Sequence, residues 1–139
     1  MSPAALTPAL ALDLVRELSA DVRAVLILSA GGERLAGPPE LAAAAQALAA
    51  AAGDAPEAEA VTPDGVVCFA RDPDHVAIAV CGPFAIPGVV RADLRAALAG
   101  IEGGAVPPTP ERPRDGSPGD PLQTAAEALI SAVQRGFRA

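Results

Sequence analysis

The sequence is poor in the side chains on which much nucleic-acid recognition depends. Its 139 residues include no tryptophan, no tyrosine and no lysine, and only 2% of them are aromatic. Proteins that hold single-stranded nucleic acids stack the bases on aromatic side chains within a basic surface. The net charge of −7 instead repels phosphate groups. We therefore expect no nucleic-acid partner.

Histidine and cysteine, which supply many catalytic and metal sites, are almost as scarce. The one histidine, His75, falls where a turn meets a strand, and we expect a partly exposed edge residue rather than a catalytic base. The two cysteines form no CxxC motif and no histidine pair accompanies them, which argues against zinc. If the turn at residues 72–74 sets the register, Cys81 lies opposite residue 65 or 66 and not opposite Cys68. The two cysteines would then be poorly placed to form a disulfide. We predict buried free thiols, no catalytic residue, no cofactor and no metal site, and hence no enzyme.

Long apolar runs and targeting signals are also missing. Asp13 and Arg16 interrupt the N-terminal stretch, which lacks the basic start and apolar core of a signal peptide. The Ala-rich run at 42–52 is too short to span a bilayer. We expect a cytoplasmic protein that is not inserted into a membrane.

The apolar pattern predicts one α/β (α+β) domain over residues 1–103. Thr7-Pro8 begins a helix of roughly 7–20, in which Leu10, Leu14 and Leu18 form the expected inner face. A second helix covers 38–53, and a third begins near 87. This order of helix, two strands, helix, three strands and helix predicts a five-stranded, mostly antiparallel sheet between helical layers. The expected strands are 22–30, 33–36, 58–62, 66–70 and 75–81.

In the third helix the apolar spacing separates an inner from an outer face. Arg91 and Arg95 fall on the face expected to meet solvent. The residues expected to face the core are Val90, Leu94, Leu98 and Ile101.

A Pro/Gly-rich segment at 104–120 separates this domain from a short amphipathic helix at 121–139. The stretch 103–121 holds six prolines and four glycines, a composition typical of an extended tether. Asp120-Pro121 is a helix start, and one apolar stripe follows it. We expect this tethered helix to bind a protein partner or its own dimer. The stripe consists of Leu122, Ala126, Leu129, Ile130, Val133 and Phe137.

The second helix is the segment with the clearest consequence. Between Glu40 and Asp54 it has no charge, and Gln46 is its only polar side chain. A helix without a polar face is usually buried on all sides, yet a helix connecting two strands of a small domain lies outside the sheet. We infer that its outer face packs on a second copy across a two-fold axis. The alternative is an Ala-rich surface helix of high intrinsic propensity. The interface interpretation selects Leu41, Ala44, Ala45, Leu48 and Ala52.

Two stretches flank this helix and the three short strands after it. LVRELSADV runs into AVLILSAGGERLAG as a helix followed by a strand-GG-strand hairpin, and AVCGPFAIPGVVRADLRAAL forms a last strand, loop and closing helix. This arrangement, over roughly 8–101, resembles the roadblock / dynein light chain superfamily.

The resemblance implies a homodimer whose sheets join at the third strand, with Ala58, Ala60 and Thr62 in the interface. It also implies a non-enzymatic regulator or scaffold of a small Ras-like GTPase. Such a regulator acts by holding the switch segments of the GTPase in a competent arrangement.

Two other functions remain open. A structural adaptor of the same fold would recruit a protein through the C-terminal helix. A small-molecule sensor would need a pocket with convergent polar groups, and few polar side chains fall at inward positions.

Overall fold

The computed structural model describes residues 7–18, 21–102 and 121–136. The helices in these ranges are α1 (Pro8–Leu18), α2 (Ala42–Ala52), α3 (Pro87–Glu102) and α4 (Pro121–Gly136), with a 3-10 turn, η1 (Pro39–Leu41), before α2. The strands are β1 (Val22–Ser29), β2 (Arg34–Ala36), β3 (Glu57–Thr62), β4 (Gly65–Arg71) and β5 (His75–Cys81). The predicted order of elements is confirmed.

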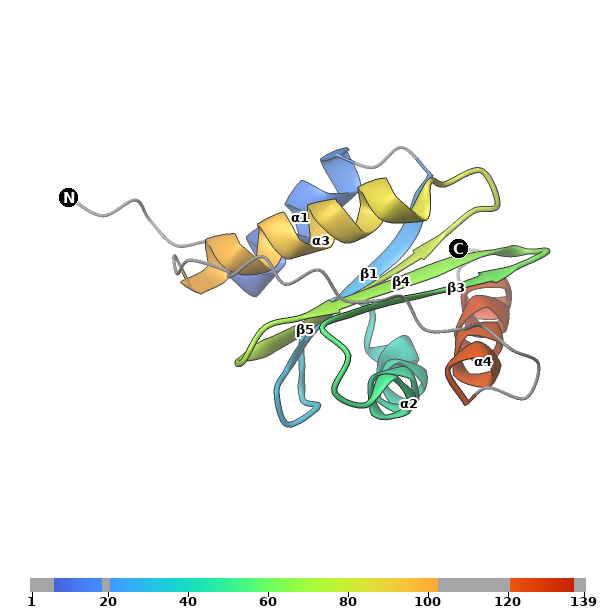
Figure 1. Cartoon of the computed structure of the whole chain (residues 1–139), viewed down its shortest axis with the longest axis horizontal. Helices are drawn as coiled ribbons and strands as arrows, with labels where there is room; N and C mark the ends of the chain where they lie inside the picture. Colours follow the sequence, from blue (N-terminus) through green and yellow to red (C-terminus); the bar gives the residue numbers. More distant parts are fainter. Residues whose placement is uncertain (1–6, 19–20, 103–120, 137–139) are drawn as a thin grey trace.

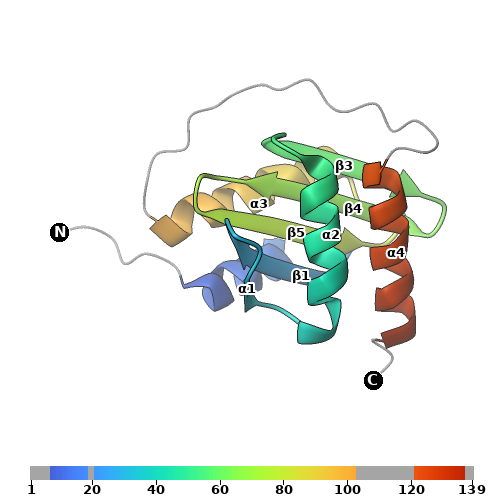
Figure 2. The same ribbon diagram turned by 90° about the horizontal axis from the view of Figure 1, so that it is seen from below.

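The five strands form one antiparallel sheet in the order β2-β1-β5-β4-β3. Helices α1 and α3 cover one face of the sheet, and α2 and α4 cover the other (Figures 1 and 2). β2 and β3 stand at the two ends of the strand order and are the edge strands. The predicted fold class, an α+β domain with its sheet between helical layers, is confirmed.

The central strands β4 and β5 are buried on both faces. Along them, large side chains point to one face of the sheet and mostly smaller side chains point to the other. On β5, Val76, Ile78 and Val80 face the core under α2 and α4. Ala77 and Ala79 face the core under α1 and α3. Since successive side chains of a strand point to opposite faces, one short sequence supplies two different packing surfaces.

The inner face of α1 differs from the prediction. Leu10 and Leu18 are about half exposed, whereas Ala11 and Val15 are fully buried. Apolar residues occupy so many positions of α1 that its pattern allows more than one stripe. The small side chain of Ala11 fits the narrow space shared with α3 and β1, and this contact selects the buried stripe.

The ends of α2 follow the predicted signals. Pro39 opens the preceding turn, and Gly53 ends the helix with a positive φ of 62°. The Arg71 guanidinium donates a hydrogen bond to the carbonyl of Ala49, with Nη2 and O 3.2 Å apart. A cation at this end satisfies a carbonyl that has no partner within the helix and complements the helix dipole.

Candidate functional site

Helix α4 packs beside α2 on the same face of the sheet, as Figure 2 shows. Leu129 and Ala126 are fully buried between α2 and the strands beneath. The side chain of Gln123 donates a hydrogen bond to the carbonyl of Val61 on β3, with Nε2 and O 3.0 Å apart. The described part of the C-terminal helix is thus one layer of the domain.

This placement corrects the expectation of a tethered helix offered to a partner. A stripe on a free helix would be exposed, but every described member of the predicted stripe is buried in the chain's own core. The physical reason is that the stripe completes an apolar layer that α2 alone leaves open. The buried members are Leu122, Ala126, Leu129, Ile130 and Val133. Phe137 lies outside the described residues.

The side chains predicted for the dimer interface also lie inside the domain. Ala44 is partly buried against the core, and the other seven are buried. The small side chains do receive a second helix, but in the structure that helix is α4 of the same chain. The seven buried side chains hold the fold and offer no free surface. The seven are Leu41, Ala45, Leu48, Ala52, Ala58, Ala60 and Thr62.

Thr62 has a local role at the β3–β4 turn. Its hydroxyl oxygen accepts hydrogen bonds from the backbone N–H groups of Asp64 and Gly65, each at 3.1 Å. A hydroxyl that closes a turn in this way substitutes for a backbone partner. Thr62 therefore shapes the hairpin that places the edge strand β3.

Among the described residues, no strand pairs with the outer edge of β3, and the register shows which backbone groups face that edge. The Arg71 N–H donates to the Pro56 carbonyl at 2.9 Å, and the ladder continues to Thr62 opposite Gly65. In an antiparallel ladder, only every second residue exchanges hydrogen bonds with a given neighbour. The residues whose backbone groups turn away from β4 are Glu57, Glu59 and Val61.

The carboxylates of this edge strand are held by α3. The Arg91 guanidinium contacts Glu57 and Glu59, each with N and O 2.8 Å apart, and Arg95 contacts Glu57 at 2.7 Å. Both arginines stay outside the core, as predicted, and remain partly exposed at 25% for Arg91 and 42% for Arg95, but these ion pairs turn their guanidinium groups towards β3. The network joins α3 to the edge of the sheet.

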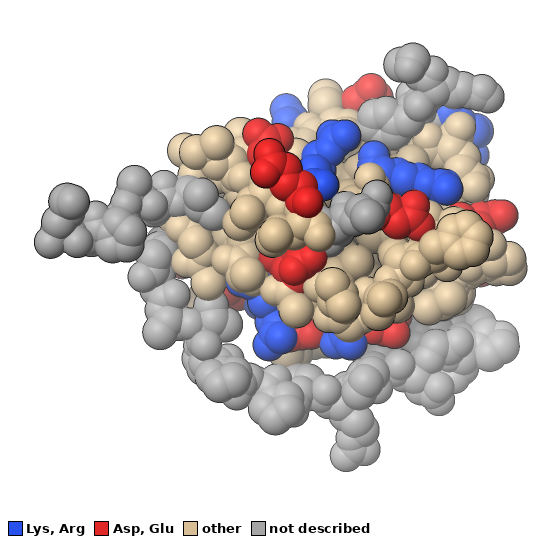
Figure 3. Space-filling model, turned by 90° about the horizontal axis from the view of Figure 1, so that it is seen from above, with Lys and Arg blue, Asp and Glu red and all other residues tan. Residues whose placement is uncertain are grey.

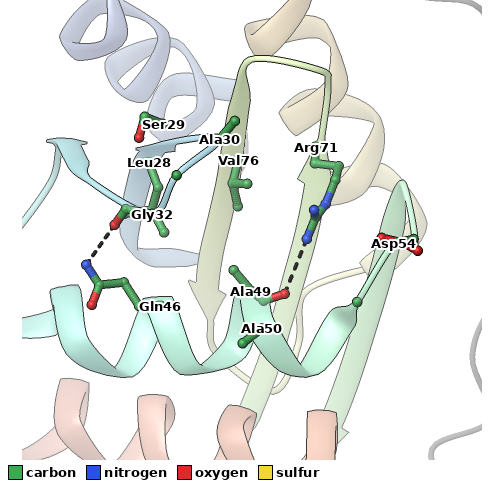
Figure 4. A pocket seen from close by; sticks show the side chains of 12 residues that line it. Leu28, Ser29, Ala30, Gly32, Gln46, Ala49, Ala50, Asp54, Arg71 and Val76 are labelled. Carbon is green, nitrogen blue, oxygen red and sulfur yellow. Dashed lines mark hydrogen bonds between the residues drawn. The ribbon is translucent and has the colours of Figure 1, made fainter.

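A groove of about 500 Å³ lies between α2 and the ends of β1, β4 and β5 (Figure 4). Gln46 donates from Nε2 to the Gly32 carbonyl at 2.7 Å, and the Ser29 hydroxyl accepts from the Glu33 N–H at 3.1 Å. The Arg71 guanidinium donates a hydrogen bond to α2, and its Cζ lies 5.0 Å from the centroid of the Phe69 ring. Because these polar side chains are engaged with the chain itself, the groove gives little support to a small-molecule sensor.

The thiols and the imidazole are buried in the sheet. Val66 pairs with Cys81 and Ala79 with Cys68, which confirms the predicted register, and both cysteines are free and buried. Burial raises the pKa of the Cys68 thiol well above its ordinary value of 9.0 and that of Cys81 to about 12. At neutral pH both are therefore protonated and poorly nucleophilic.

His75 is 8% exposed, so the expectation of a partly exposed residue is wrong. Its ring lies 3.7 Å from the Asp72 carboxylate, Nδ1 to Oδ1, and the backbone N–H of His75 donates to the same oxygen at 2.7 Å. Asp72 thus shapes the β4–β5 turn, as its position in a turn predicts. In the described part of the chain, no three His, Cys, Asp or Glu residues gather as metal ligands would.

No family model matches the sequence, and no curated protein matches it either. Solved structures do share its architecture. The crystal structure of a roadblock/LC7 domain from Streptomyces avermitilis aligns with a TM-score of 0.57 at 13% identity, over 67% of this chain and 92% of that one. The chain has the roadblock fold. The crystal structure of MglC from Myxococcus xanthus also aligns, with a TM-score of 0.49 at 14% identity, over 67% of this chain and 94% of that one.

The roadblock fold confirms the resemblance that the hairpin and the order of elements indicated. Nearly the whole Streptomyces domain is matched by two thirds of this chain. Across the described ranges, no helix has the length and apolar character needed to cross a bilayer.

Proposed function

We propose that this chain is a non-enzymatic, homodimeric regulator or scaffold of a small Ras-like GTPase. The observation that carries the proposal is the roadblock fold, which bears out the resemblance from which this function was inferred. Two protonated, buried thiols and a buried imidazole within the sheet agree with a role that needs no nucleophile. Free thiols also suit a reducing compartment, and we place the protein in the cytoplasm.

The homodimer would form along the free edge of β3. The outward backbone groups of Glu57 and Glu59 are a template for a second copy of the same strand. At Val61 the outward carbonyl already accepts from Gln123 of α4. Pairing of this kind needs no side chain of α2, so it is compatible with α4 lying over that helix. It replaces the helix-to-helix interface inferred from the alanine pattern.

A structural adaptor is the second candidate, but the arrangement of α4 favours it less. Recruitment through the C-terminal helix would expose the five buried side chains of its stripe. Losing that burial costs roughly 1.5–3 kcal/mol for each large apolar side chain. A partner would have to compensate this loss before any net binding appeared.

Multi-angle light scattering tests the proposed function directly. The purified protein is measured alone, with a small Ras-like GTPase carrying a non-hydrolysable GTP analogue, and with the same GTPase carrying GDP. We expect a dimer that gains the mass of one or two GTPases only with the GTP analogue. A dimer that gains no mass in either nucleotide state would reject the GTPase in favour of the adaptor, and a monomer would reject the dimer.

A further inference from the structure

Four large apolar side chains project into solvent around one shallow groove. Phe84 is 88% exposed, Ile86 65%, Leu18 52% and Val89 51%. All four line a hollow of about 170 Å³ between the end of α1 and the start of α3, together with Asp21, Ala85 and Val90. We call Leu18, Phe84, Ile86 and Val89 the Phe84 patch. It lies on the α1–α3 side of the sheet, and Figure 3 shows that this side mixes acidic, basic and uncharged surface.

The loop that presents Phe84 is held in place by Asp21. The Gly82 N–H donates to the Asp21 backbone carbonyl at 2.9 Å, and the Phe84 N–H donates to the Asp21 carboxylate at 3.2 Å. A Cβ at residue 82 would come 2.5 Å from Oδ2 of that carboxylate, so a larger residue there would push the Asp21 side chain away from its present position. The exposed ring is therefore presented by a constrained backbone, which lowers the ordering cost of binding.

The size and charge of the patch argue against a second copy as its occupant. Its exposed apolar area is on the order of 400 Å². A stable dimer buries about 800 Å² on each partner. Self-association through the patch would also bring two Asp21 carboxylates towards one another in a chain of net charge −7. A patch of this size suits a transient contact with a different protein.

Position in the fold links the patch to the regulated partner. The opposite face of the sheet is covered by α2 and α4, and β3 is the edge proposed for dimerisation. None of the patch residues belongs to α2, α4 or β3. A partner seated on the patch would therefore leave both the dimer edge and the α4 layer intact.

We infer that the Phe84 patch is the surface that binds the GTPase. The Phe84 ring enters an apolar cleft of the GTPase, and a basic group of the GTPase lies opposite Asp21. This inference rests on the proposed function, since it takes its partner from there. Aromatic residues, phenylalanine among them, are enriched at protein interfaces relative to the rest of the surface.

Phe84→Asp and Ile86→Asp test the patch, and Leu10→Asp is the matched control, since Leu10 is 53% exposed on α1 and does not line the groove. Thermal unfolding first verifies that each variant folds; Phe84→Ala replaces Phe84→Asp if that variant does not. Binding to the GTPase carrying a GTP analogue is then measured by fluorescence anisotropy. We expect Kd to rise at least about tenfold for the two patch variants and to stay within about twofold for Leu10→Asp.

The outcomes separate the inference from the function beneath it. Wild-type binding that Phe84→Asp leaves unchanged would overturn the patch and retain the GTPase regulator. A wild-type protein that binds the GTPase in neither nucleotide state would overturn the proposed function and, with it, the partner assigned to the patch. A Phe84→Asp variant with half the wild-type mass in light scattering would identify a second copy as the occupant instead.

Discussion

Ala45 and Ala47 lie on opposite faces of α2, so their methyl groups have different surroundings. Ala45 is fully buried between α2, α4 and the sheet, whereas Ala47 is exposed. The same substitution at the two positions therefore separates a packing effect from a change in helix propensity.

We expect Ala45→Arg to lower the free energy of unfolding by about 3 kcal/mol or more, because it overpacks the layer and buries a charge. Ala47→Arg should change it by less than about 0.5 kcal/mol. Urea unfolding followed by circular dichroism measures both. An Ala45→Arg protein as stable as wild type would show that α4 does not cover this face of α2 in solution.

The two thiols give a dependence of stability on alkaline pH. Their pKa values are raised in the folded state, mainly by burial, from the ordinary 9.0. The unfolded chain therefore releases these protons at lower pH than the folded chain does, and the free energy of unfolding falls as pH rises from about 9 towards 12. Because the sequence has no lysine and no tyrosine, few other groups titrate in this window.

Urea unfolding at pH 7, 9 and 10.5 checks this dependence. The control is Cys68→Ala/Cys81→Ala, in which the decline above pH 9 should be shallower. An equally steep decline in that variant would assign the effect to groups other than the thiols.

At the scale of elements, α4 is the helix whose role the structure changes most. Its apolar stripe and its start at Pro121 are visible in the sequence, and the helix is observed there. An amphipathic stripe shows that one face must be buried, but it does not identify the surface that buries it. The three-dimensional arrangement places that surface on α2, β3 and β4 of the same chain.

Leu129→Ala should lower the free energy of unfolding by about 2–5 kcal/mol, since it leaves a cavity between α4 and the sheet. Thr124→Ala, at an exposed position of the same helix, is the control and should be nearly neutral. Differential scanning calorimetry measures both. An unchanged transition in Leu129→Ala would restore the interpretation of α4 as a helix reserved for a partner.

At the scale of the whole molecule, the proposed dimer depends on the outer edge of β3. The backbone N–H of Glu59 faces away from β4, so a proline there removes a donor from the outer edge and none from the sheet's own ladder. Glu59→Pro also removes the ion pair with Arg91, and Glu59→Ala controls for that loss.

We expect Glu59→Ala to remain a dimer and Glu59→Pro to run as a folded monomer in light scattering. Circular dichroism verifies that both retain the fold. If Glu59→Pro keeps the wild-type dimer mass, the β3 edge is not the interface.

The sequence by itself determined the elements and their neighbours in the chain. Turn residues such as Gly53 and Asp72 and the alternation along β5 are local signals. The roadblock resemblance rests on the order of the elements and on the strand-GG-strand hairpin. Only the tertiary structure decided which apolar surfaces meet. Leu10 and Leu18 were expected inside and are half exposed, while Arg91 and Arg95 turn to β3. Periodicity reports that a face is apolar, but the partner of that face comes from residues far away in the chain, as α4 on α2 shows.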